Sequence, residues 1–113
     1  MPTISKMTES TGVNQLAQQF FAAARELALH TGTLQERLVD AYADHLLAIT
    51  LHDLPEQLQP IFAEVEERLN AGVGEDDDDP FHAAAAALSD TEAQQLIERI
   101  LVLYARLVAA AAQ

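Results

Sequence analysis

The chain of 113 residues has no cysteine and no tryptophan, and it has only four glycines and four prolines. Without a thiol, disulfides, thiolate catalysis and thiolate metal sites are excluded. Because small secreted domains often need disulfides, the lack of cysteine favours the cytoplasm. The polar N-terminal segment is unlike a secretory signal, and no apolar run has the length of a transmembrane helix. The sequence therefore predicts a cytoplasmic protein that does not enter a membrane.

Basic residues are also scarce. Six Lys and Arg stand against 18 Asp and Glu, which gives a formal net charge of -12. A field of this sign repels phosphate backbones, so direct binding to nucleic acid is not expected. The same field favours a basic partner protein.

Half of the residues are apolar, and they recur at steps of three and four, which predicts amphipathic helices. We expect an all-α fold: a small antiparallel bundle of about four main helices, plus one short alanine-rich helix from Pro80 to Leu88. Residues 1–12, rich in Ser and Thr, are predicted to be a mobile tail. Residues 13–113 then form a single helical domain with an acidic loop at 72–80.

Helix starts are indicated by the capping-box spacing, in which a Ser, Thr or Asp is followed three residues later by a Glu. Thr33 with Glu36, Asp53 with Glu56, and Ser89 with Glu92 have it. Pro60 leaves two alternatives open, because a proline deep in a helix removes a hydrogen bond. Either the third helix begins near Gln59, after a separate short turn, or one longer helix bends at Pro60.

The run Glu75, Asp76, Asp77, Asp78 and Asp79 is the least ordinary stretch of the chain. Calcium loops need oxygens at alternating positions and a glycine for the bend, and this run has neither. Mutual repulsion favours an extended, hydrated hinge between helices. The other interpretation is a recognition element for a basic partner.

Two further groups are candidates for partner binding. Glu36, Asp40 and Asp44 repeat every four residues on the side of the second helix opposite its apolar stripe, and Leu47 and Leu51 fall near them. If Leu47 and Leu51 lie together, they form a patch for a partner or for a second copy of the chain. The last helix also has a broader apolar face than one groove requires, which is a further hint of association.

Chemistry has few candidates. His45 lies within the apolar stripe of the second helix, so we expect a buried polar residue that needs a hydrogen-bond partner. The Glu-x-x-His motif of di-metal carboxylate bundles is missing, and the serines fall in the N-terminal segment or at a cap. We therefore expect no enzyme, no metal and no cofactor.

Two functions follow from these patterns. The first is a small non-catalytic helical protein that acts by protein–protein contact, as an interaction or regulatory module and possible homodimer. The alternative is an acidic inhibitor or nucleic-acid mimic, of the immunity or anti-nuclease type, that occupies the basic cleft of a partner protein.

Overall fold

A computed structural model describes residues 2–70 and 86–112, with only the backbone described for residues 2–11. The described residues form an all-α fold. The main helices are α1 (Pro2–Leu29), α2 (Leu34–Ala41), α3 (Gln59–Asn70) and α5 (Asp90–Ala111). Three short helical segments join α2 to α3: η1 (Tyr42–Leu46), η2 (Leu51–Asp53) and η3 (Glu56–Leu58). The alanine-rich helix and the acidic loop lie largely outside the described residues.

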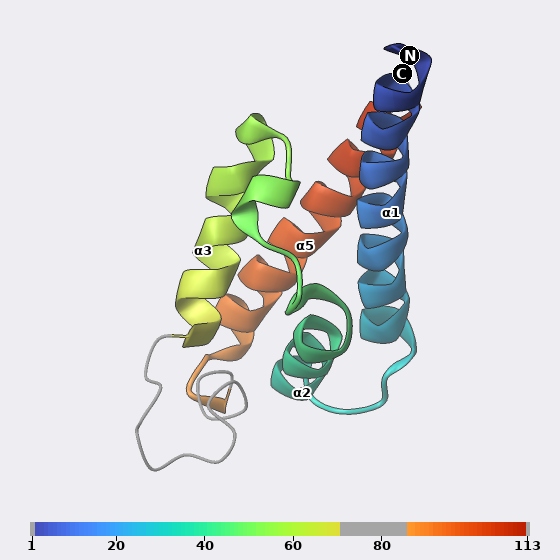
Figure 1. The fold of residues 1–113 in the computed structure, drawn as a ribbon. Coiled ribbons are helices and arrows are strands. Elements are labelled where there is room, and N and C mark those ends of the chain that lie inside the picture. The colour runs from blue at the N-terminus through green and yellow to red at the C-terminus, as the bar shows by residue number, and fades with distance from the viewer. Residues whose placement is uncertain (1, 71–85, 113) are drawn as a thin grey trace.

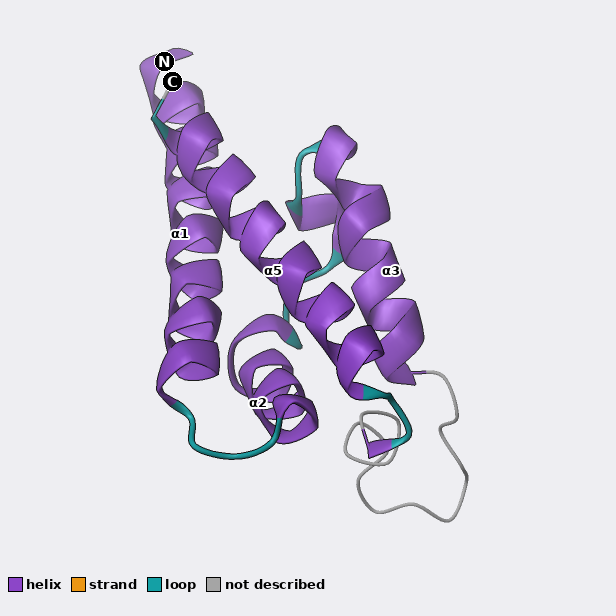
Figure 2. Ribbon diagram, turned by 180° about the vertical axis from the view of Figure 1, so that it is seen from behind, coloured by secondary structure: helices purple, strands orange, loops and turns teal. Residues whose placement is uncertain are grey.

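Helices α1 and α5 lie side by side and antiparallel, so both chain termini are at the same end of the molecule (Figure 1). Helix α2 contacts both of them, and α3 packs along α5. We call residues 34–53, which hold α2, η1 and η2, the α2 arm. Viewed from behind, α5 runs between α1 and α3 and passes in front of the segment that joins α2 to α3, while α2 lies between the lower ends of α1 and α5 (Figure 2). One face of the α1–α5 pair therefore covers the core, and the other face has no helix over it within the described residues.

The core is built from the predicted apolar stripes. Phe20 of α1 and Phe62 of α3 meet edge to face, with ring centroids 5.9 Å apart. Both rings are fully buried. Edge-to-face aromatic pairs are stabilising beyond the area they bury. Helix α5 contributes Ala93, Leu96, Ile100, Leu103 and Leu107 to the same cluster.

The predicted start of the first helix at Val13 is wrong. Helix α1 begins at Pro2, so residues 2–12, expected to be a tail, are helical. Proline suits a first helical turn, because its missing N–H has no partner there and its φ is already helical. Ser and Thr only weakly disfavour a helix, and a single Gly12 costs about 1 kcal/mol at most, so composition did not fix this boundary.

Two predicted caps are confirmed. Thr33 and Ser89 form reciprocal capping boxes with Glu36 and Glu92. The pairing of Asp53 with Glu56 is wrong, because Asp53 ends η2 and accepts hydrogen bonds from the backbone and hydroxyl of Thr50. Of the alternatives at Pro60, the first is confirmed, since η3 is a separate turn and α3 begins at Gln59.

The second helix does not continue regularly to Ile49. After Ala41 it widens into a π-helical turn, in which the N–H of Leu47 donates to the carbonyl of Tyr42 at 2.9 Å. The extra residue changes which side chains face the core. Tyr42 and Leu46 are buried, and His45, the residue between them on the predicted stripe, is displaced from it.

Candidate functional site

Helix α1 has two different flanks on either side of its buried stripe. One flank is polar and carries Gln15, Gln19, Glu26 and His30, spaced by four, seven and four residues. It faces the α2 arm, where Glu26 is paired with His45 and His30 with Asp40. The other flank is apolar and meets α5, where the rings of Phe21 and Tyr104 lie 5.9 Å apart. The two flanks define two candidate surfaces.

The apolar flank remains largely exposed. Phe21 is 52% exposed, and Leu101 and Val108 of α5 are each 43% exposed. We call Phe21, Leu101, Tyr104 and Val108 the outer α1–α5 face. Isolated exposed leucines are ordinary, but neighbouring large apolar side chains on two packed helices are typical of contact surfaces.

The outer α1–α5 face has little charge around it. Arg25 lies four residues after Phe21, and Glu98 lies three before Leu101. Both are exposed. The other described residues three or four positions from members of the face are uncharged: Ala17, Gln18, Ala24, Ile97, Ile100, Ala105, Leu107, Ala111 and Ala112. In a chain of net charge -12, this face carries one base and one acid.

The predicted burial of His45 is wrong. Its side chain is 29% exposed, because the π-turn gives the core position to Leu46. The expected hydrogen-bond partner exists nevertheless. His45 Nε2 lies 2.9 Å from Glu26 Oε1 on the polar flank of α1. Asp44 joins this pair, so that one ligand atom from each of the three side chains lies within 4.8 Å of the others.

A second histidine–carboxylate pair joins α1 to α2. His30 Nε2 lies 2.7 Å from Asp40 Oδ2, and His30 Nδ1 accepts the backbone N–H of Gly32 at 2.8 Å. Since Nδ1 is the acceptor, Nε2 carries the proton and donates it to Asp40. Both ring nitrogens are thus used. A Cβ at position 32 would lie 2.7 Å from His30 Cε1, so glycine is required for this close approach.

The three acidic candidates on the second helix have different surroundings. Glu36 is exposed, and hydrogen bonds from the Thr33 backbone and hydroxyl lower the pKa of its carboxyl. Asp40 is paired with His30, while Asp44 belongs to the cluster with Glu26. These acids do not form one uniform surface. The run from Glu75 to Asp79 lies outside the described residues.

The two leucine candidates differ in burial. Leu47 is 47% exposed, whereas Leu51 is half-buried and packs against the core. The sequence did not identify Phe21, Glu26 or His30 as candidates. The sequence does contain a signal for them. On either side of the buried stripe that contains Phe20, the helical spacing places an apolar flank with Phe21 and a polar flank with Glu26 and His30.

Burial shifts the acidity of two neighbouring groups on the inner side of the fold. Desolvation raises the pKa of the Tyr42 hydroxyl, and the nearby Glu66 carboxylate raises it further, while the Asn70 side chain opposes the shift. Desolvation also raises the pKa of the Glu66 carboxyl. Glu66 is therefore an acid whose charged form is disfavoured by folding.

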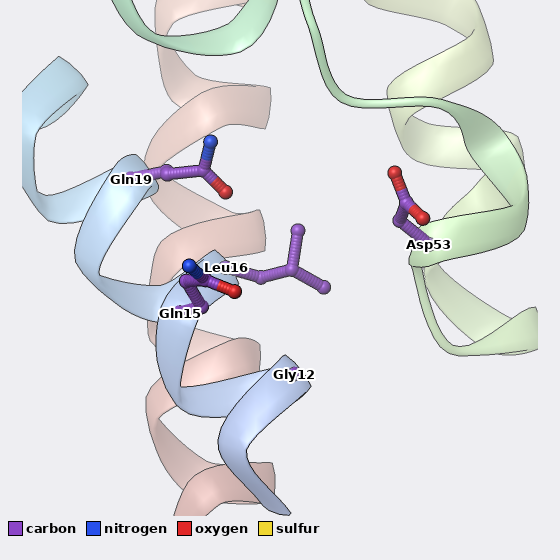
Figure 3. A pocket seen from close by; sticks show the side chains of 5 residues that line it. All are labelled: Gly12, Gln15, Leu16, Gln19 and Asp53. Carbon is purple, nitrogen blue, oxygen red and sulfur yellow. The ribbon is translucent and has the colours of Figure 1, made fainter. Parts of the chain in front are cut away.

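Two open hollows adjoin these surfaces. The first has a volume of about 210 Å³ and lies between α1 and η2, with the Asp53 carboxylate facing Gln15, Leu16 and Gln19 (Figure 3). The second, of about 370 Å³, lies between α3 and α5 beside the ion pair of Glu64 with Arg99. The first hollow is lined by one carboxylate, Asp53, and in the second the carboxylate Glu64 lies beside two arginines, Arg99 and Arg106.

Comparisons with protein-family models, with curated proteins and with solved structures found no match. No described helix combines the length and the apolar character needed to cross a membrane.

Proposed function

We propose that this protein is a non-catalytic helical module that acts by protein–protein contact, and that its outer α1–α5 face binds a second copy of the chain. The observation that carries the proposal is the exposure of Phe21, Leu101 and Val108 on a face with almost no charge. Aromatic residues are enriched at the buried centres of protein interfaces, where charged residues are depleted and a few residues supply most of the free energy.

Charge limits where a second copy can bind. Two copies of a chain of net charge -12 repel each other, so they can approach closely only through a neutral surface. The outer α1–α5 face is such a surface, with Arg25 and Glu98 of opposite sign at its border. In a two-fold symmetric dimer the same patch meets itself, and each base can lie near the other copy's acid.

The remaining polar groups support a role without catalysis. His30 uses both ring nitrogens in hydrogen bonds that hold α1 to α2. Arg68 and Arg99 pair with Glu92 and Glu64, which join α3 to α5. These contacts hold helices together, so their role is structural. The location in the cytoplasm stays a prediction from the sequence.

The alternative, an acidic inhibitor or nucleic-acid mimic, rests on the exposed carboxylates Glu36 and Asp44 together with the net charge. Asp40 suits it less well, because its oxygen is paired with His30. The two functions differ in salt dependence. Salt screens repulsion between two acidic copies and strengthens a dimer, whereas it weakens attachment to a basic cleft.

The test is the molar mass of the protein by light scattering at low and high salt. Leu101→Glu places a carboxylate in the centre of the interface on both copies, and we expect it to weaken self-association by at least about 100-fold, the effect of losing a central interface residue. Leu47→Glu is the matched control, because Leu47 is as exposed as Leu101 but lies on the α2 arm. A dimer that survives Leu101→Glu and dissociates with Leu47→Glu would show that the face is wrong.

A further inference from the structure

Three side chains that can bind a cation converge where α1 meets the π-turn. Glu26 comes from the polar flank of α1, and Asp44 and His45 are consecutive residues of η1. The set contains an imidazole nitrogen and two carboxylates, and it comes from two separate helices. It is therefore a mixed donor set assembled by tertiary packing.

The two consecutive residues that reach the same partner both lie in the π-turn. In an α-helix, adjacent side chains point about 100° apart, since each turn has 3.6 residues. The wider π-turn reduces this angle only slightly. Asp44 and His45 nevertheless each bring one ligand atom within 4.8 Å of the Glu26 carboxylate and of each other, while Tyr42 and Leu46 are buried. Single π-turns inside helices recur at functional sites.

The separation of the donor atoms fits a metal ion. Nitrogen and oxygen ligands lie about 2.0–2.2 Å from Zn²⁺ in a tetrahedral arrangement, so two ligand atoms are about 3.3–3.6 Å apart. His45 Nε2 and Glu26 Oε1 are separated by 2.9 Å, the length of the hydrogen bond between them, so an ion would replace that bond and move the two atoms slightly apart. The Asp44 oxygen lies within 4.8 Å of both. Small side-chain rotations are then sufficient to place all three atoms around one ion.

The chemistry of the set selects the kind of cation. Imidazole suits Zn²⁺ and other divalent transition metals, whereas calcium and magnesium prefer oxygen ligands alone. Two carboxylates supply the charge that balances a dication. Asp44 is exposed and His45 only partly buried, so water can complete the coordination. We propose that Glu26, Asp44 and His45 form a binding site for a divalent transition-metal ion of the Zn²⁺ type, which ties α1 to the α2 arm.

The chain contains its own control. His30 and Asp40 form a pair of the same kind and nearly the same spacing, at the same junction of α1 with the α2 arm. The two places differ in the number of ligands. Among the described residues, three such side chains come together at Glu26, Asp44 and His45, whereas His30 and Asp40 are only a pair. The affinity for a metal ion held by these three side chains should therefore depend far more on His45 than on His30.

The experiment is calorimetric titration of the untagged protein with ZnCl₂ at neutral pH, with thermal unfolding measured alongside. We expect saturable binding of one ion and a rise in the melting temperature, because an ion that binds only the folded state stabilises it. Glu26→Gln, Asp44→Asn and His45→Gln should each weaken Zn²⁺ binding at least about tenfold, as the loss of even an outer contact of a metal ligand does. Binding should also weaken as the pH falls, because protons compete for the same donor atoms.

His30→Gln should weaken Zn²⁺ binding less than His45→Gln does, because it removes a contact between α1 and α2 but no ligand of the ion. The triple variant Glu26→Gln, Asp44→Asn, His45→Gln should abolish binding while its circular dichroism stays helical. No saturable Zn²⁺ binding by the unmodified protein would overturn the proposal. So would a triple variant that binds Zn²⁺ as tightly as the unmodified protein, because the ion would then be held elsewhere in the chain.

Discussion

Phe20 and Phe21 are neighbours in α1 and have opposite surroundings. Phe20 is fully buried against Phe62, whereas Phe21 is 52% exposed beside Tyr104. The inner side of α1 is complete, since its apolar groups are covered by other helices of the same chain. The outer side is not covered in this way, since its apolar groups are in contact with water. This difference in exposure is the reason for proposing the outer α1–α5 face as the interface.

The largest expected effect tests this difference directly, by truncating each ring in turn. Phe20→Ala should reduce the free energy of unfolding by about 3–5 kcal/mol, because it leaves a cavity in the core. Phe21→Ala should cost no more than about 1 kcal/mol, the size of one exposed aromatic contact. Urea denaturation of the monomer at low protein concentration measures both. Equal losses would mean that the outer ring is part of the core after all.

A smaller effect is expected at Gly12, on the exposed part of α1. A Cβ at this position meets nothing within 4 Å, and the backbone is helical on both sides. Gly12→Ala should therefore raise the free energy of unfolding by about 0.5–1 kcal/mol, mainly by restricting the unfolded chain. Thermal unfolding checks the gain. An unchanged melting temperature would favour the tail predicted from the sequence over a helix that starts at Pro2.

The smallest effect concerns Glu66, an acid at the edge of the inner side. Because its pKa is raised in the folded protein, ionising Glu66 opposes folding at neutral pH. As the pH falls through this raised pKa, the carboxyl takes up a proton and the penalty disappears. Glu66→Gln should then be more stable than the unmodified protein at pH 7, by about 0.5 kcal/mol or less, as for most substitutions near a surface.

The matched control for Glu66 is Glu67→Gln, because Glu67 is the next residue and is exposed. At neutral pH the gain in stability from Glu66→Gln should exceed that from Glu67→Gln. An advantage of Glu66→Gln that grows on acidification would have the wrong sign for a desolvated carboxyl.

The sequence predicted the fold class and most of the inner side. The stripes of α3 and α5 were identified by periodicity, and Thr33 and Ser89 by their capping boxes, because these signals are local. The start of α1 was missed, since weak helix formers tolerate a helix when nothing opposes it. The π-turn at Tyr42 was missed as well, because its cause lies in packing between distant segments.

The candidate surfaces were predictable only in part. The breadth of the apolar face on α5 was visible in the sequence, but its meeting with Phe21 depends on the antiparallel pairing of α1 with α5. Asp44 and His45 were each identified as polar candidates. Their partner Glu26 lies 19 residues from His45 in the sequence, and only the fold brings it within 2.9 Å.

Sedimentation equilibrium of the unmodified protein over a wide range of concentrations tests the central claim most directly, because it reports whether the outer α1–α5 face has an occupant. We expect a mass that rises from the 12.3 kDa of one chain towards that of two, and that rises at lower protein concentration when salt is added. A mass of one chain at every concentration and every salt level would contradict the account.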